Sequence, residues 1–332
     1  MAAFFSLVAV AALMLIAYVG AGAGMQGFFG IFLPYVAIAV FIVGFVIKIY
    51  NWASAPVPFR IPTTAGQQKS LPWIKRNRFD NPTSGFETFV RMILEVVTFR
   101  SLFRNTSIQL DKEQGRVGFN SAKWLWLFAL TFHYCFLLVL IRHLRFFLQP
   151  LPAGIANLDF MDSILQIGAP QLYITDIGIL VGLGFLLLRR FFDSKVRYIS
   201  LPSDYFPLFL ILGIALTGMW MRYITKVDVI NIKDLAYGLV TLSPVLPSNI
   251  SATFFVHLFL VCVLFMYFPF SKLMHMGGVF LSPTRNLPND SRIRRHINPW
   301  NDPEVKPHSY AAYEDDYREK MIEAGLPVEK EA

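Results

Sequence analysis

Residues 124–146 read WLWLFALTFHYCFLLVLIRHLRF, a stretch that is apolar for almost all of its length yet contains His133 and His143. A helix that crosses the hydrocarbon core of a bilayer needs about 20 mostly apolar residues, and this stretch meets that requirement. An ionisable side chain in such a helix is costly and usually faces the interior of the bundle, where it serves a function. The stretch therefore predicts an integral membrane protein with a polar site among its helices.

Five further stretches have the same character, at roughly 3–23, 29–50, 172–190, 204–223 and 251–271. The chain is 55% hydrophobic and only 16% charged, whereas soluble proteins average about 25% charged residues. We predict an all-α, polytopic transmembrane helix bundle of six spans: a five-helix core over residues 29–280 and an extra N-terminal helix within 1–28. Ala21-Gly22-Ala23 resembles a signal-peptide cleavage site, but the stretch lacks a basic start, so we expect a retained helix.

Lys and Arg are distributed unevenly between the connecting segments. Segment 51–123 contains eleven, residues 189–203 contain four and the tail from 271 contains nine, whereas 147–171 contains none and 225–250 contains two. Cytoplasmic segments carry the excess of basic residues, so both termini and the two basic loops are expected in the cytoplasm, in a multi-pass protein of the cell membrane. Topology also explains the formal net charge of +8, and nucleic-acid binding is not predicted.

Two segments lie outside the predicted spans, and neither is large enough for an independent catalytic domain. Residues 51–123 are expected to form a cytoplasmic loop, with an amphipathic helix over 87–104 lying on the inner membrane face. Docking of a soluble partner through this helix is an alternative that can coexist with membrane binding. Residues 281–332 are expected to form a cytoplasmic tail, an extended arm with a short terminal helix that would gain order on another subunit.

Four of the six histidines lie in or at the end of apolar stretches, and these are His133, His143, His257 and His275. Neutral imidazole is a good iron ligand, and a bundle core is a natural place for a cofactor held from facing helices. With the predicted orientation, the two helices run in opposite directions. Pairing by depth gives His143 with His257 near the outer face and His133 with His275 near the inner face. Each pair could hold the iron of one haem b, so that two haems would be stacked across the membrane.

The spacing between His257 and His275 conflicts with a straight helix. Eighteen helical residues span about 27 Å, but the ten residues from His133 to His143 span only about 15 Å. A break at Pro269 would help to reconcile the two lengths, so we expect irregular structure over Ser271 to Met276.

A single membrane histidine is more often a hydrogen-bonded helix contact or part of a proton relay than a haem ligand. Two helices with two depth-matched histidines each favour haem. His296 and His308 lie in the polar tail and are interpreted as solvated surface residues. Cys135 and Cys262 both lie in apolar runs, which indicates small core residues rather than a disulfide or an iron–sulfur site.

The pattern His-x9-His on one helix and His-x17-His on a later one resembles the nitrate reductase gamma subunit family, dihaem cytochromes b that oxidise quinol. In that family the four matching positions are the axial haem ligands, with the pairing given above. The resemblance covers roughly residues 29–280. This chain departs from the family pattern in its extra first helix and its long 51–123 segment.

The 51–123 segment contains IPTTAGQQKSL at 61–71, DNP at 80–82 and FRSLFRNT at 99–106. These motifs resemble the DsrM family, the cytochrome b subunits of the membrane complex linked to dissimilatory sulfite reduction. The resemblance implies electron exchange between menaquinone and a cytoplasmic iron–sulfur partner related to heterodisulfide reductases. It also implies a multihaem cytochrome c, a periplasmic iron–sulfur protein and a second membrane subunit. The basic loop and tail are then the expected docking surface for the cytoplasmic partner.

Residues that would bind a quinone or the haem propionates are less clearly marked. In the nitrate reductase relatives the quinone site lies by the outer haem and uses a Lys of the following outer loop, but segment 147–171 has no Lys. Arg142 and Arg145 flank His143 and are candidates for a quinone carbonyl or a propionate, unless their side chains simply extend to the interface. The candidates for the inner propionates are Arg189, Arg190 and Lys272.

Three carboxylates are possible proton acceptors on the outer side, or else ordinary loop and helix-end residues: Asp159, Asp162 and Asp176. Taken together, the sequence predicts an electron-transfer subunit of an oxidoreductase complex, not a complete enzyme. The alternatives are the cytochrome b subunit of another quinol-linked reductase, of nitrate or heterodisulfide type, a histidine-relay transporter, and a haem-bearing anchor. A transporter would be favoured by an inverted repeat of hydropathy, which the sequence does not show.

Overall fold

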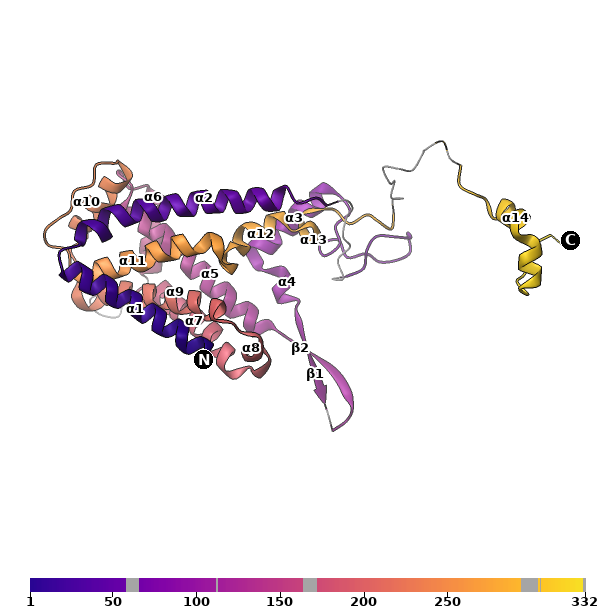
Figure 1. Ribbon diagram of the computed structural model, residues 1–332, viewed down its shortest axis with the longest axis horizontal. Helices are drawn as coiled ribbons and strands as arrows, with labels where there is room; N and C mark the ends of the chain where they lie inside the picture. The colour runs from indigo at the N-terminus through magenta and orange to yellow at the C-terminus, as the bar shows by residue number, and fades with distance from the viewer. Residues whose placement is uncertain (58–65, 112, 164–171, 294–303, 305, 331–332) are drawn as a thin grey trace.

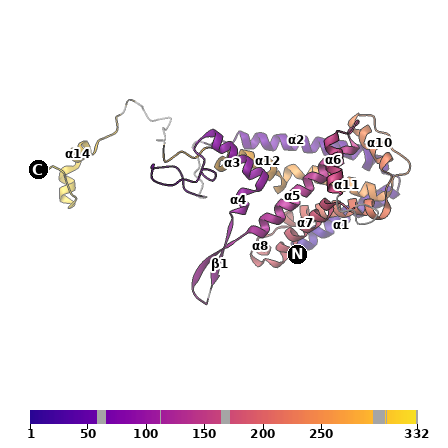
Figure 2. The same cartoon turned by 180° about the vertical axis from the view of Figure 1, so that it is seen from behind.

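The computed structural model describes residues 1–57, 66–111, 113–163, 172–293, 304 and 306–330. The chain is mostly helical, and its long helices run side by side along the long axis of an elongated bundle (Figure 1). One end of the bundle carries the short helices α6 (Ala153–Asp162) and α10 (Val229–Val240). The other end holds a β-hairpin and the short helices α3 (Gly85–Thr98), α4 (Arg100–Phe103), α8 (Ser194–Ile199), α12 (His275–Leu281) and α13 (Pro283–Asn286). The view from behind shows the same separation (Figure 2).

Five helices in the described part of the chain are long and apolar enough to cross a membrane: Ala2–Gly22, Phe28–Ala53, Lys123–Phe146, Pro202–Thr225 and Ala252–Phe270. They contain α1 (Ala2–Gly22), α2 (Leu33–Ala53), α5 (Lys123–His143), α9 (Pro202–Trp220) and α11 (Ala252–Tyr267). A π-helical turn precedes α2 at Phe28–Phe32, and another extends α9 at Met221–Thr225. These lengths suit a multi-pass membrane protein.

Helix α7 (Ile174–Phe192) occupies the place of the sixth predicted span but is not among these five, because Asp176, Arg189 and Arg190 fall within its 19 residues. It packs along α5 in the bundle. At the crossing point, a Cβ on Gly182 would lie 2.9 Å from the backbone nitrogen of Phe132. Only a glycine allows this close an approach, so the sequence of α7 is adapted to the bundle interior.

The main apolar core lies between α1, α2, α9 and α11. Its fully buried members include Ala17, Leu210, Phe255 and Leu260. Gly213 of α9 faces this core, where an added Cβ would lie 3.3 Å from Leu260 and 3.5 Å from Val10. The N-terminal helix is therefore an integral part of the packed bundle.

The amphipathic helix predicted within 87–104 is present but is broken into α3 (Gly85–Thr98) and α4 (Arg100–Phe103). Ser84 caps α3 by accepting a hydrogen bond from the backbone N–H of Glu87, and the Glu87 carboxylate accepts the backbone N–H of Thr83 in return. Phe99 separates the two helices with a left-handed backbone, φ 49°. The bend turns the chain toward the membrane helices.

A two-stranded antiparallel hairpin follows, formed by β1 (Thr106–Asp111) and β2 (Arg116–Ser121), and it corrects the all-α prediction. Its turn is built locally, since the Asp111 carboxylate accepts the backbone N–H groups of Glu113 and Gln114, and Gly115 has φ 61°. Asp and Gly favour such turns for these reasons. The hairpin projects from the bundle, and all residues of both strands are exposed.

The tail after α12 (His275–Leu281) and α13 (Pro283–Asn286) folds back onto the 66–84 segment. Asn289 donates to the Asn81 side chain at 2.7 Å and accepts from Gln68 at 3.0 Å. Its backbone N–H also donates to the Pro82 carbonyl at 2.6 Å. Gln68, Asn81 and Asn289 are buried, so loop and tail share a small polar core rather than acting as separate segments.

The C-terminal helix α14 (Tyr310–Glu323) stands apart from the bundle (Figure 1). The chain that follows α14 folds back onto the helix, because the Glu314 carboxylate accepts hydrogen bonds from the backbone N–H groups of Glu329 and Lys330. The segment that leads to it, including His296, lies outside the described residues. His308 lies at the surface, 3.3 Å from Asp316.

Candidate cofactor site between facing helices

The four membrane histidines form two facing pairs between α5 and the α11–α12 segment. The ring centres of His143 and His257 are 6.5 Å apart, and those of His133 and His275 are 6.0 Å apart. An iron ion bound on both sides needs about 2.0 Å to each nitrogen and about 1.1 Å more to each ring centre, roughly 6.2 Å in all. Both pairs therefore have the separation that a shared iron requires, and the pairing is the one predicted by depth.

Each imidazole is oriented by a hydrogen bond at Nδ1. Nδ1 of His133, His143 and His275 lies 2.7, 2.7 and 2.8 Å from the backbone carbonyls of Ala129, Val139 and Lys272. A carbonyl only accepts, so these Nδ1 atoms carry the proton and Nε2 keeps its lone pair. Metal-bound histidines are held in this way by a partner on the other ring nitrogen. By whole-residue exposure, His143 and His275 are exposed and His133 and His257 are half-buried.

His257 is held by two neighbouring residues of α9. The Thr217 hydroxyl lies 3.0 Å from its Nδ1 and 2.7 Å from the Gly213 carbonyl. The hydroxyl has one proton, so donation to the carbonyl leaves it to accept from His257. The next residue is Gly218, where an added Cβ would lie 3.2 Å from Cε1 of His257. Thr217 and Gly218 thus form a shallow cradle for the ring.

The expected break before His275 is confirmed. Helix α11 ends at Tyr267, and short 3-10 turns follow at Phe268–Phe270 and Lys272–Met274, separated by Ser271 in an extended conformation. Pro269 is fully buried. An added Cβ on Gly44 of α2 would lie 2.7 Å from it, so α2 packs tightly on the break. The irregular turns place His275 at the depth of His133, which a continuous helix would not do.

The start of α5 joins His133 to the amphipathic helix α3. Trp126 donates to the Thr98 carbonyl at 2.7 Å, and Tyr134 donates to the Val97 carbonyl at 2.9 Å. These bonds satisfy carbonyls that the end of α3 would otherwise leave without partners. The ring of Phe99 then lies 5.0 Å from the His133 ring, nearly perpendicular to it. The bend at Phe99 therefore places an aromatic wall beside the inner histidine.

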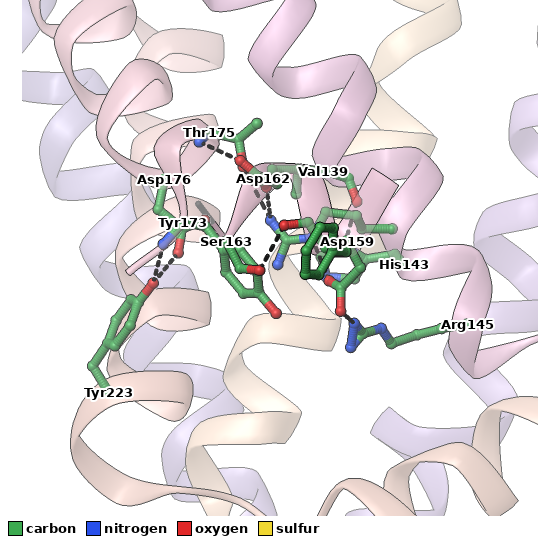
Figure 3. A network of polar contacts seen from close by, with 12 residues as sticks. Val139, His143, Arg145, Asp159, Asp162, Ser163, Tyr173, Thr175, Asp176 and Tyr223 are labelled. Atoms are coloured by element: carbon green, nitrogen blue, oxygen red, sulfur yellow. Dashed lines mark hydrogen bonds and ion pairs between the residues drawn. The ribbon is translucent and has the colours of Figure 1, made fainter. Parts of the chain in front are cut away.

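A network of charges lies beside His143 (Figure 3). Arg142 is only 11% exposed and pairs with Asp159 and Asp162, while its Nη1 donates to the Thr175 hydroxyl at 3.0 Å. Asp162 also accepts the Thr175 backbone N–H at 2.9 Å. Arg142 is therefore fixed by α6 and α7 and does not extend to the interface. The two aspartates, expected as ordinary loop carboxylates or proton acceptors, balance its charge.

The outer carboxylates of this network have further partners. Asp159 also pairs with Arg145 at 2.6 Å. Burial raises the pKa of Asp159, but the hydrogen bond and charge of Arg145 outweigh it and hold the pKa below its usual value. Asp176 accepts a hydrogen bond of 2.7 Å from the Tyr223 hydroxyl (Figure 3). Asp159 therefore remains ionised at neutral pH.

Arg222 is a residue of this region that sequence reasoning missed. The Tyr173 ring lies between two guanidinium groups, 3.4 Å from that of Arg142 and 3.8 Å from that of Arg222. Nε of Arg222 is buried and has no hydrogen-bond partner among the described residues. The sequence feature that could have identified Arg222 is its position as a basic residue at the end of an apolar stretch, five residues after Thr217.

Two basic residues, Arg190 and Lys272, lie around Asp204 at the start of α9. Lys272 lies 2.7 Å from its carboxylate and Arg190 3.9 Å, and Arg190 also donates to Ser200 at 2.9 Å. Arg189 lies 4.0 Å from Asp193 instead. The structure thus brings Arg190 and Lys272 together at a shared carboxylate.

A bare metal ion does not fit the described residues, which contain no group of three or more His, Cys, Asp or Glu side chains suited to hold one. Cys135 and Cys262 are free thiols in the helix packing. Two-histidine sites suit a metal whose other ligands come from a cofactor. The spacing, the oriented Nδ1 atoms and the cradle at Gly218 all fit the axial ligation of two haems.

Comparison with known proteins gives two results. The family model of the nitrate reductase gamma subunit matches residues 86–292, a span that contains all four histidines but not α1 or α2. The chain is also similar to two proteins described as Hdr-like menaquinol oxidoreductase cytochrome b-like subunits. The one from Archaeoglobus fulgidus is 48% identical over 284 residues, 83% of this chain and 84% of the relative. The one from Archaeoglobus profundus is 42% identical over 275 residues, 81% of each chain.

Proposed function

This chain belongs to the nitrate reductase gamma subunit family, and on that premise we propose that it is a dihaem b membrane subunit that exchanges electrons between menaquinone and a cytoplasmic iron–sulfur subunit. The observation that carries the proposal is the pair of facing imidazoles at two depths, 6.5 Å and 6.0 Å apart. Oxidation of one menaquinol releases two electrons and two protons and leaves menaquinone. Two haems, when bound, would pass the electrons singly from one membrane face to the other.

In this proposal the chain crosses the membrane six times, with α7 as the sixth span. The charges of α7 fit such a role because they lie at its ends, Asp176 in the first turn and Arg189 and Arg190 in the last. The termini, the hairpin and helices α3, α4, α12 and α13 would then be cytoplasmic, while α6 and α10 would be outside. Impermeant thiol reagents should label Leu110→Cys only from the inside and Phe160→Cys only from the outside, in a chain without its native cysteines.

Arg222 is proposed as the ligand of an outer-haem propionate, in addition to the candidates Arg142 and Arg145. Arg142 already forms ion pairs with two carboxylates, and Arg145 forms an ion pair with one. Arg222 instead keeps a buried Nε without a partner in the described chain. A guanidinium beside a propionate gives a strong, charge-assisted bond. On the inner side, Arg190 and Lys272 remain the candidates.

The cytoplasmic partner is proposed to cover the hairpin together with the basic loop. One face of the hairpin carries four exposed apolar side chains in paired positions: Ile108, Leu110, Val117 and Phe119. A two-stranded hairpin is at best marginally stable on its own, so packing of this apolar face against another protein surface would stabilise it. We propose a heterodisulfide-reductase-like iron–sulfur subunit, in a complex of sulfur metabolism that also holds a multihaem cytochrome c, a periplasmic iron–sulfur protein and a second membrane subunit.

The partner proposal is tested by pull-down of the iron–sulfur subunit with Phe119→Asp, which places a charge on the apolar face. Asn120→Asp, on the opposite face of the same strand, is the matched control. Loss of the partner only in Phe119→Asp supports the docking surface. Equal retention by both variants contradicts it.

The haem proposal is tested by optical spectroscopy of the purified chain. It should show a reduced b-type spectrum and two non-covalent haems per chain. His143→Ala and His257→Ala should remove the same spectral component, and His133→Ala and His275→Ala should remove the other. A colourless but fully assembled preparation would exclude the proposal. Retained assembly with loss of quinol-driven reduction in these variants would exclude a merely anchoring role.

A further inference from the structure

A groove of about 510 Å³ lies between α1, α9 and α11, and none of the residues that line it belongs to α5. Apolar side chains form most of its wall, among them Met14, Leu216 and Val256. Its volume falls within the range of about 300–1,000 Å³ that small-molecule sites have. The groove is distinct from the network around Arg142, which lies between α5, α6 and α7.

Four hydrogen-bonding side chains line this otherwise apolar groove: Tyr18, Thr217, Trp220 and Thr253. The Tyr18 hydroxyl, the Trp220 indole N–H and the Thr253 hydroxyl have no hydrogen bond to any described residue. They come from three different helices yet line the same open groove. Apolar walls with a few convergent polar groups are what an amphiphilic ring system requires.

Thr217 connects the groove to the outer histidine pair. It is buried, lines the groove, and lies 3.0 Å from Nδ1 of His257. Its hydroxyl donates to the Gly213 carbonyl and accepts from His257, which leaves one lone pair free. A ligand O–H in the groove could donate to that lone pair. One side chain would then separate the ligand from the proposed haem ligand.

We infer that this groove binds the ring of a quinone or quinol, and that α1 contributes one wall of the site. The inference rests on the proposed function and adds a place for its substrate. It also gives the N-terminal helix a role, since α1 lies outside the segment that the family model matches. Tyr and Trp are common at membrane interfaces in general, but that tendency does not explain why the groove reaches a buried threonine bonded to His257.

A blocking substitution tests the site in the full-length chain with its partner subunits. Ala11 is exposed and lines the groove, so Ala11→Trp should fill it. Ala9 is also exposed, but it lies two residues earlier, about 200° around the helix, so Ala9→Trp is the matched control. Menadiol, a soluble quinol, should reduce the haems at least tenfold more slowly in Ala11→Trp than in Ala9→Trp. Dithionite should reduce two haems per chain in both.

The polar groups are tested by Thr253→Val, which is nearly isosteric, and by Trp220→Phe, which keeps an aromatic ring of smaller size; each removes one hydrogen-bonding group. Loss of one bond should raise the menadiol concentration for half-maximal rate by about five- to tenfold. The haem spectra should not change. In addition, a photoreactive azidoquinone should label residues in 11–18, 216–220 or 253–256.

The outcomes separate the groove from the proposed function. If dithionite reduces both haems and Ala11→Trp reacts with menadiol as fast as Ala9→Trp, the groove is not the site. Labelling only at α6 and α7, or only on another subunit, overturns it as well. Absence of haem from the wild-type chain would instead overturn the proposed function.

Discussion

The imidazole rings of His143 and His257 face each other at 6.5 Å with an angle of only 16° between their planes. The inner pair differs, since the His133 and His275 rings are inclined by 80° at a similar distance. The difference follows from how each ring is held. His257 is bonded to Thr217 of a neighbouring helix, whereas His275 is bonded to the Lys272 carbonyl in the irregular turn after Pro269.

With the two proposed haems bound and oxidised, the two angles predict two different electron paramagnetic resonance signals. Two parallel imidazole planes interact with the same one of the two iron d orbitals of π symmetry. The energies of these two orbitals then differ, which gives a rhombic low-spin spectrum. Two perpendicular planes interact with one of these orbitals each, so the two orbital energies stay nearly equal. The result is a broad signal with a larger maximal g value. His143→Ala should remove the rhombic signal and His133→Ala the broad one. Two identical signals would contradict the ring orientations.

Gly218 is predicted to set the environment of the outer haem. In Gly218→Ala the new Cβ would meet Cε1 of His257 at 3.2 Å, so the ring must shift by a few tenths of an ångström. We expect a changed outer-haem signal and midpoint potential, with the inner haem unaffected. Gly184→Ala is the control, because a Cβ there meets nothing within 4 Å. Redox titration followed optically checks both variants, and a response of both haems to Gly218→Ala would contradict the local effect.

The helices and the histidine pairing could be predicted from the sequence because both follow from rules that act along the chain. Hydropathy identified five helices that the structure also shows as long and apolar, and the charge bias ordered the histidines by depth. The break before His275 was predictable because Pro269 cannot continue a helix. The sixth span stays a prediction, since the charges of α7 lower its apolar character.

The features that could not be predicted depend on contacts between distant segments. Arg222 and Tyr173 are 49 positions apart, and only the fold stacks one on the other. The DNP motif at 80–82 marked a resemblance, but its physical role, a buried contact with Asn289, requires the tail to fold back over more than 200 residues. The hairpin was missed because its strands are short and every residue is exposed.

Asn289 is predicted to hold the tail to segment 66–84. Asn289→Ala leaves the buried side chains of Gln68 and Asn81 without one partner each. A buried polar group without a partner costs about 1–3 kcal/mol, so local opening should become at least about tenfold more frequent. Limited proteolysis of membranes should then cut segment 66–84 faster. Asn120→Ala, on the exposed hairpin, should leave the cleavage rate unchanged, and equal rates in both variants would contradict the shared polar core.

Acid is predicted to loosen the start of α3 through Glu87. Burial raises the pKa of this carboxyl, but the Thr83 backbone N–H and the Arg76 guanidinium outweigh it and hold the pKa below 4.5. A carboxyl with a lowered folded-state pKa stabilises the fold above its unfolded pKa, and that contribution is lost as pH falls through the folded value. Proteolysis between Thr83 and α3 should therefore accelerate below about pH 4.5. Glu87→Gln removes this titration, so the variant should be cut faster than the wild type at pH 7. Its cleavage rate should also increase less on acidification. An unchanged pH profile in Glu87→Gln would assign the acid response to another group.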